Sequence, residues 1–199
     1  MNVISVLKYL TLLVFSYCAY GQTCLHKNLS KSLDYQVSFE RTKNDSCIIS
    51  VTVIKKDSNI SLQTVVIKSE FIFEKDFQDC AFTRSYTTHV NDDHNNADNQ
   101  FEDFIVADFN FDGKEDFAVK RDSGGNGGSL YSYFIQNDNE KFELNDYLTN
   151  TMVYFPIIFN KKKLTLTTLV HANAYQRNRT IYKCDSKTTW KIVSEKLEN

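Results

Sequence analysis

The stretch Ile105-Val-Ala-Asp-Phe-Asn-Phe-Asp-Gly-Lys-Glu-Asp-Phe-Ala-Val119 decides the fold prediction, because a polar loop stands between two short apolar runs. Oxygen-bearing side chains recur at alternate positions, namely Asp108, Asn110 and Asp112. Gly113 follows them, where a calcium-binding loop needs a residue that tolerates a sharp bend. In such loops the side chains at positions 1, 3 and 5 converge on an ion that prefers six to eight oxygen ligands. The spacing therefore predicts a calcium loop.

Two further positions complete the predicted ligand set. The backbone carbonyl of Lys114 would bind at position 7, so a lysine side chain is tolerated there. Asp116 would bind at position 9, directly or through water. The glutamate that closes an EF-hand at position 12 is absent, because Val119 and Lys120 stand there. The loop is therefore expected to join two strands rather than two helices. An acidic hairpin turn without metal is the alternative.

Short β-rich runs bounded by turn residues extend over the rest of the chain, and a long helical period is absent. They predict strands near 35–39, 47–54, 62–73, 130–135, 142–144, 164–171, 179–182 and 190–197. The polar lead-in at 22–32 is expected to be irregular. We therefore predict an all-β, mainly antiparallel fold: a single compact β-sandwich domain with one calcium loop between two strands.

The first 21 residues have the features of a secretory signal peptide. Lys8 is the only charge, an apolar core spans 9–17, and small residues at positions 19 and 21 predict cleavage before Gln22. The apolar core is shorter than the roughly 20 residues that a membrane span needs. A lipoprotein signal at Cys18 is the alternative. The remaining chain, 22–199, is predicted to be one periplasmic or secreted domain, with an N-terminal meander and polar loop (22–100) and a calcium-loop half (101–199).

The cysteines that follow the predicted signal peptide are even in number. They are Cys24, Cys47, Cys80 and Cys184, and in an exported chain they predict two disulfides. Three pairings are possible, and we favour Cys24 with Cys184, which ties the termini together, and Cys47 with Cys80. A CxxC pair is absent, so neither zinc nor redox chemistry is expected.

Other features of the sequence exclude several function classes. The formal net charge is −2 and no basic stripe is present, which argues against nucleic-acid binding.

The segment 88–103 is strongly polar and predicts a surface loop, with a metal site at His89 and His94 as the alternative. No nucleophile elbow or zinc-protease motif occurs, and His171 alone suggests no general base. We therefore predict that the protein is not an enzyme.

Four glycines fall within 124–128, directly after the predicted metal loop. A phosphate-binding loop is excluded, because no Gly-Lys-Ser/Thr ending and no helix pattern follow. Glycines allow close approach of the backbone to a ligand or to another chain. The segment is therefore predicted to contact a partner through Gly124, Gly125, Asn126, Ser129 and Tyr131.

The loop pattern Asp-x-Asn-x-Asp-Gly-x-x-Asp between apolar runs resembles the calcium motif of FG-GAP repeats. Those repeats recur around a propeller, whereas the motif occurs once here, so a complete propeller is excluded.

The order of motifs from Phe101 to Leu197 resembles a family of exported bacterial proteins. These are calcium-binding periplasmic immunity proteins that inhibit lysozyme-like effectors of type IV secretion systems. The resemblance rests on the metal loop, the glycine cluster, the sequence Tyr-Ser-Tyr-Phe at 131–134 and a late Trp-Lys-Ile-Val at 190–193.

The resemblance implies bound calcium and a protein partner, with a lysozyme-like hydrolase as the candidate. Inhibition would be steric, through a surface loop such as 122–131. The alternative is a calcium-stabilised adhesion or carbohydrate-binding domain with Tyr131, Tyr133 and Tyr175 as its aromatic platform.

Overall fold

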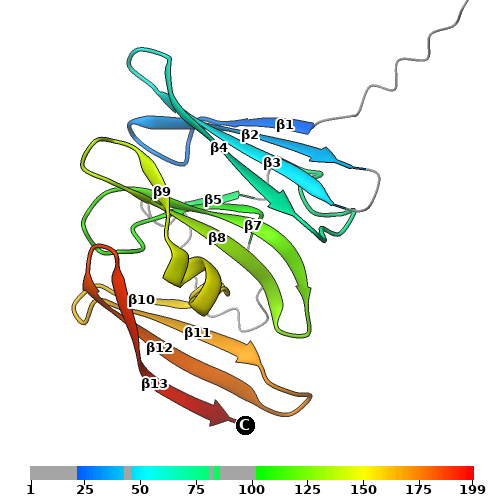
Figure 1. Cartoon of the computed structure of the whole chain (residues 1–199), viewed down its shortest axis with the longest axis vertical. Coiled ribbons are helices and arrows are strands. Elements are labelled where there is room, and N and C mark those ends of the chain that lie inside the picture. The colour runs from blue at the N-terminus through cyan, green and yellow to red at the C-terminus, as the bar shows by residue number, and fades with distance from the viewer. Residues whose placement is uncertain (1–21, 43–45, 81–82, 86–101) are drawn as a thin grey trace, which may run out of the picture.

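The computed structural model describes residues 22–42, 46–80, 83–85 and 102–199. The predicted signal peptide, Cys18, His89 and His94 lie outside the described residues. The prediction of a mainly antiparallel all-β fold is confirmed, and the strands form three open sheets stacked in layers (Figure 1). The sandwich therefore has three layers rather than two. A short π-helix, η1 (Leu148–Met152), interrupts the strands.

The N-terminal sheet is a meander in the order β1-β2-β3-β4. Its strands are β1 (Gln22–His26), β2 (Leu33–Arg41), β3 (Cys47–Lys55) and β4 (Ile60–Ser69), all antiparallel to their neighbours. Burial alternates along β2 and β3, as period two in their sequences predicts. The predicted irregular lead-in is wrong in part, because β1 pairs along the edge of β2 over five residues.

The middle sheet has the order β5-β6-β7-β8-β9 and carries the predicted metal loop. Its strands are β5 (Thr83–Ser85), β6 (Phe104–Ala107), β7 (Asp116–Gly125), β8 (Gly128–Gln136) and β9 (Phe142–Leu144). β5 pairs with β6 in parallel, and the other pairs are antiparallel. The glycine cluster forms the tip of the β7–β8 hairpin.

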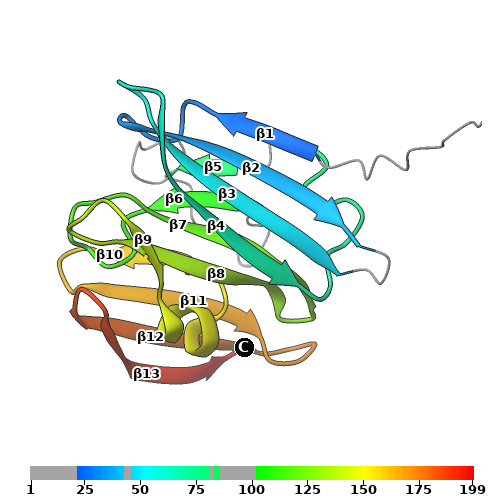
Figure 2. The same cartoon turned by 45° about the horizontal axis from the view of Figure 1, so that its top comes forward.

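The C-terminal sheet has the order β10-β11-β12-β13 and lies on the other side of the middle sheet (Figure 2). Its strands are β10 (Ile158–Asn160), β11 (Thr165–His171), β12 (Arg177–Ser186) and β13 (Thr189–Glu198), again antiparallel.

Two hydrophobic cores separate the three layers, and the middle sheet contributes side chains to both. The N-terminal core lies between the N-terminal and middle sheets, and the C-terminal core lies between the middle and C-terminal sheets. Phe104 and Phe117 face the core shared with the N-terminal sheet, whereas Ile105 and Ala118 face the core shared with the C-terminal sheet. Successive strand residues point to opposite faces, so a strand buried on both faces is apolar throughout rather than alternating. This explains the unbroken apolar character of the runs that flank the metal loop.

The predicted pair of disulfides is wrong. Cys24 bonds to Cys80, with a Cα–Cα distance of 5.4 Å, and ties β1 to the segment that follows β4. Cys47 and Cys184 are buried thiols, and they belong to different cores on opposite sides of the middle sheet. They cannot reach one another, because a disulfide requires Cα atoms within about 7 Å. The observed disulfide fits an exported protein.

Candidate metal centre

The predicted metal loop connects β6 to β7 within the middle sheet. The pairing of Ala107 with Asp116 closes its base. Phe109 is fully buried in the C-terminal core, with ring centroids 5.1 Å from Tyr133 and 5.9 Å from Phe155. Phe111 packs against the same core. Phe109 and Phe111, the second and fourth residues of the loop, thus anchor it in this core, and the oxygen-bearing residues alternate with them.

Backbone N–H groups already organise the predicted ligands into a tight turn. The two carboxylate oxygens of Asp108 accept the N–H groups of Asp112 and Gly113 at 3.0 and 2.9 Å. Asn110 Oδ1 accepts the Asp112 N–H at 3.1 Å, and Asp112 Oδ1 accepts the Lys114 N–H at 2.9 Å. Gly113 has φ +86°, a left-handed conformation that costs glycine little. The chain is therefore preshaped around these side chains.

The donor chemistry of the loop fits a hard cation such as calcium. Asp112 Oδ2 is buried and has no hydrogen-bond partner among the described residues. Burial, and then the nearby Asp112 carboxylate, raise the pKa of Asp108, although backbone hydrogen bonds oppose the shift. A cation would relieve the crowding of these like charges.

The loop geometry is nevertheless not that of a completed metal cage. Within the ranges that the structure describes, no group of three His, Cys, Asp or Glu side chains already converges as a metal site. The carboxylates instead accept backbone N–H groups, but each carboxylate offers about four acceptor sites. Each carboxylate therefore keeps acceptor sites beyond the backbone N–H groups that it already accepts.

Asp116 has a second function in the structure besides its predicted ligand position. Its Oδ2 accepts the Phe109 N–H and its Oδ1 accepts the Gln136 N–H, both at 2.9 Å. The side chain is fully buried, and burial raises its pKa well above the usual range. Asp116 thus fastens the start of the metal loop to the end of β8.

The loop is also tied to the turn between β12 and β13. Asn110 Nδ2 donates to the carbonyl oxygen of Lys187 at 3.2 Å. Asp138, from the β8–β9 turn, pairs with both Lys114 and Lys187 at 2.6 and 2.9 Å. These two ammonium groups lower the pKa of Asp138 to about 2. The metal loop therefore connects the middle and C-terminal sheets.

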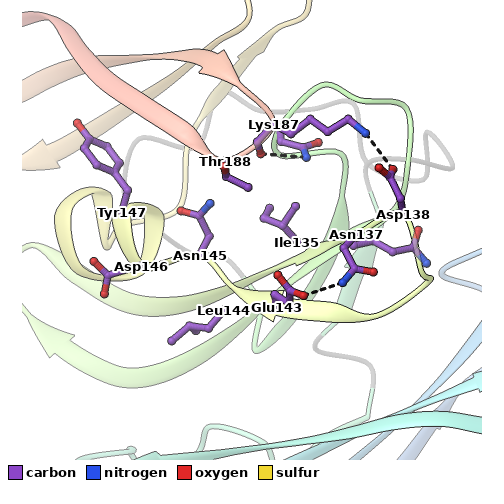
Figure 3. A pocket seen from close by; sticks show the side chains of 12 residues that line it. Ile135, Asn137, Asp138, Glu143, Leu144, Asn145, Asp146, Tyr147, Lys187 and Thr188 are labelled. Carbon is purple, nitrogen blue, oxygen red and sulfur yellow. Dashed lines mark hydrogen bonds and ion pairs between the residues drawn. The ribbon is translucent and has the colours of Figure 1, made fainter.

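A pocket of about 410 Å³ lies beside the loop, between the middle and C-terminal sheets (Figure 3). Asn110 forms part of its wall, and Ile135, Asn145 and Thr188 point into it. Lys187 extends along its rim toward Asp138, as the dashed line marks. Its wall combines amide and carboxylate side chains with the apolar surface of Ile135, Leu144 and Tyr147.

The predicted partner-binding residues are divided between surface and core. Gly125 and Asn126 are exposed at the tip of the β7–β8 hairpin, and Gly124 and Ser129 are partly exposed beside them. Gly124 has φ +65° and its backbone packs so closely on Gly128 that any Cβ would clash. The glycines therefore make a tight turn.

The prediction for Tyr131 is wrong, because the side chain is only 1% exposed. Its hydroxyl donates to the carbonyl of Glu102. Tyr133 is likewise fully buried, so an aromatic platform of Tyr131, Tyr133 and Tyr175 does not form.

Tyr175 is 89% exposed at the turn between β11 and β12. Asn173 Oδ1 accepts the N–H groups of Tyr175 and Gln176, both at 2.9 Å, and Ala172 N–H donates to the Gln176 carbonyl. The turn is thus held by its own hydrogen bonds, and its aromatic side chain projects into solvent.

One buried cluster of charged side chains was not predicted. Asp76 follows β4, Asp103 directly precedes β6 and Lys120 lies in β7, and the lysine forms an ion pair with each carboxylate. The sequence signal was limited to a lysine at the end of the apolar run 117–119.

No known family model matches the chain, and no curated protein matches it in sequence. Its fold is similar to that of a solved structure described as a Xanthomonas type IV secretion system related protein, with a TM-score of 0.55. The two chains are 16% identical, and the match covers 89% of this chain and 87% of the other. In the part of the chain that the structure describes, no helix is long and apolar enough to cross a membrane.

Proposed function

We propose that the protein is an exported, calcium-binding protein-interaction module that inhibits a lysozyme-like cell-wall hydrolase by steric blockage. The buried Asp112 Oδ2, which lacks a partner among the described residues inside a loop of calcium-type spacing, carries the metal part of this proposal. The fold shared with a type IV secretion system related protein, together with the disulfide, supports the exported setting and the protein partner.

In this proposal calcium has a structural role. Asp108, Asn110 and Asp112 would hold the ion with their side chains, Lys114 with its carbonyl and Asp116 directly or through water. Bound calcium would neutralise the crowded carboxylates and stiffen the connection between the middle and C-terminal sheets. A binding surface on stiff elements loses less conformational freedom when it binds a partner.

The tips of the β7–β8 and β11–β12 hairpins are the best candidates for the inhibitory surface. They lie side by side at the same end of the molecule in both Figure 1 and Figure 2. One tip presents Gly125 and Asn126, and the other presents Tyr175 on a hydrogen-bonded turn. An exposed aromatic side chain on a rigid turn is a frequent energetic anchor of protein interfaces. Two narrow projections of this kind suit insertion into the glycan cleft of a hydrolase.

The experiment is inhibition of a panel of lysozyme-like hydrolases by the purified protein with calcium present. Tyr175→Ala should weaken inhibition by at least tenfold, since interface anchors of this type contribute about 2 kcal/mol or more. Ile60→Ala is the matched control, because Ile60 is a 59% exposed apolar residue in the N-terminal sheet. Full turnover by every enzyme of the panel at saturating protein would reject the inhibitory function.

The burial of Tyr131 and Tyr133 removes the platform on which the carbohydrate-binding alternative depended. Tyr175 alone offers one aromatic surface, which is insufficient to favour that alternative over a protein interface.

A further inference from the structure

The buried charged cluster consists of one ammonium group between two carboxylates. Lys120 Nζ lies 2.5 Å from Asp103 Oδ1 and 3.3 Å from Asp76 Oδ1. The side chains of Lys120, Asp76 and Asp103 are only 7%, 10% and 5% exposed. Lys120 and Asp103 are also neighbours across adjacent backbones, because the Lys120 N–H donates to the Asp103 carbonyl at 2.9 Å. The amine and the carboxyl group are therefore held together by the sheet as well as by their charges.

The remaining contacts orient the two carboxyl groups differently. The Phe77 N–H donates to Asp103 Oδ2 at 2.6 Å, so this oxygen faces a fixed donor while Oδ1 faces the amine. Asp76 Oδ2 accepts the Ser123 hydroxyl at 2.6 Å, so its other oxygen is directed at Lys120. Tyr131 pairs with Lys120 from the neighbouring strand, and its buried hydroxyl donates to the carbonyl of Glu102, the residue before Asp103.

The charge balance of the cluster favours uptake of one proton. Two carboxylates and one ammonium carry a net charge of −1, and burial disfavours uncompensated charge. In agreement, burial raises the pKa of Asp103, although Lys120 opposes the shift. A cluster with the extra proton is neutral overall. Transfer of one proton from the ammonium to the ionised carboxylate then yields a neutral amine beside two neutral carboxyl groups.

We propose that Lys120 and Asp103 condense into an intramolecular isopeptide bond, with Asp76 as the proton relay. The geometry supports this reaction because a desolvated lysine is a nucleophile, and groups fixed in near contact react far faster than separate molecules. The proposal is independent of the metal loop and of the proposed inhibitory function.

The reaction balances without any added reagent. The lone pair of Lys120 Nζ attacks Asp103 Cγ, and the C=O electron pair moves onto Oδ2, where the Phe77 N–H stabilises the developing negative charge. The carboxyl group of Asp76 gives its proton to the Oδ1 hydroxyl, which leaves as water when the C–Oδ1 bond breaks. Asp76 then takes a proton from the amide nitrogen and returns to its starting state. The products are one amide bond and one water molecule.

The bond would lock β7 covalently to the residue before β6. The segment 71–80 is already fastened to β7 by the Ser123 N–H to Phe71 carbonyl bond and to β1 by the disulfide. An exported protein gains resistance to unfolding and proteolysis from such cross-links, because they restrict the unfolded chain.

Mass spectrometry of the purified wild-type chain tests the proposal directly. After reduction, the intact mass should be lower than the sequence mass by one water molecule. Trypsin cleaves after Lys114, which lies between the two residues, so the peptides that contain Asp103 and Lys120 should remain joined as one branched species. A dehydrated Asp103 that forms a cyclic imide would also lose water but would leave the two peptides separate.

Three variants identify the roles of the residues. Lys120→Arg keeps the positive charge but lacks the nucleophilic amine, so it should keep its full mass. Asp76→Asn keeps the shape but lacks the relay, so its peptides should separate. Asp103→Asn should form the same amide with release of ammonia, and its cross-linked mass should equal that of the cross-linked wild type. Separate peptides and a full intact mass in the wild-type protein after prolonged incubation would overturn the proposal, as would a water loss without the branched peptide.

Discussion

Calcium should raise the melting temperature of the wild-type protein, and Asp112→Ala should abolish that rise. Asp112 is the informative position because its Oδ1 already accepts the Lys114 N–H while its buried Oδ2 lacks a partner among the described residues. Asp112→Asn is the finer variant, since an amide oxygen can still accept the Lys114 N–H but carries no charge. The alanine variant should lose the response to calcium entirely, and the asparagine variant should need more calcium for the same response.

The expected magnitude follows from mass action. Extracellular calcium modules bind with dissociation constants of about 10⁻⁴ to 10⁻³ M. At about 10 mM free calcium, a site of this strength adds roughly 1.4–2.7 kcal/mol to the free energy of unfolding. For a domain of this size, about 1 kcal/mol corresponds to roughly 2–4 °C. The melting temperature should therefore rise by roughly 3–11 °C between excess chelator and about 10 mM calcium.

Differential scanning calorimetry measures this shift, with magnesium at the same concentration as the ion control. Asp57→Ala is the matched control variant, because Asp57 is an exposed acid in the β3–β4 turn, away from the loop. The wild type and Asp57→Ala should respond equally to calcium. A wild-type melting temperature that neither calcium nor chelator changes would show that the loop binds no calcium.

Three further predictions concern the rest of the structure. Replacing Cys24 and Cys80 by serine should lower the free energy of unfolding by about 4 kcal/mol in urea titrations, because the bond closes a loop with a sequence separation of 56; an unchanged midpoint would contradict this. Phe109→Ala should cost about 3–5 kcal/mol in the same assay, because it leaves a cavity where the metal loop enters the C-terminal core. The Asp138 carboxyl should titrate near pH 2 by NMR and move toward its ordinary value of 3.8 in Lys187→Ala. Because the folded-state pKa of Asp138 is depressed, the stability that this ion pair adds is present above about pH 4 and is lost as the pH falls through about 2. Titration of Asp138 near pH 3.8 in the wild type would refute the pairing.

The strands and the loop between β6 and β7 could be predicted from the sequence because their patterns are local. Alternation along β2 and β3 identifies half-buried strands, and the Asp108–Asp116 spacing identifies a loop between two strands. β1 was missed because its residues Gln22–His26 lack a β-branched run, and only its partner β2 makes it a strand.

Errors arose where the sheets stack. The pattern of residues 130–135 predicts a strand, but it does not show whether one or both faces of the sheet are buried. Tyr131 and Tyr133 are buried because the C-terminal sheet packs on their face of the middle sheet. The even cysteine count predicted two disulfides, but the middle sheet keeps Cys47 and Cys184 in separate cores. The cluster of Asp76, Asp103 and Lys120 likewise required knowledge of tertiary contacts that no local pattern contains.

The middle sheet also determines where the chain can change its length during evolution. From β6 and β7, Phe104, Val106, Phe117 and Val119 face one core, while Ile105, Ala107 and Ala118 face the other. Inserting or deleting one residue within β6 or β7 would exchange these sets, placing large rings where small side chains fit and leaving holes where the rings were. Homologues should therefore vary in length at the hairpin tips and keep a constant residue count through these two strands.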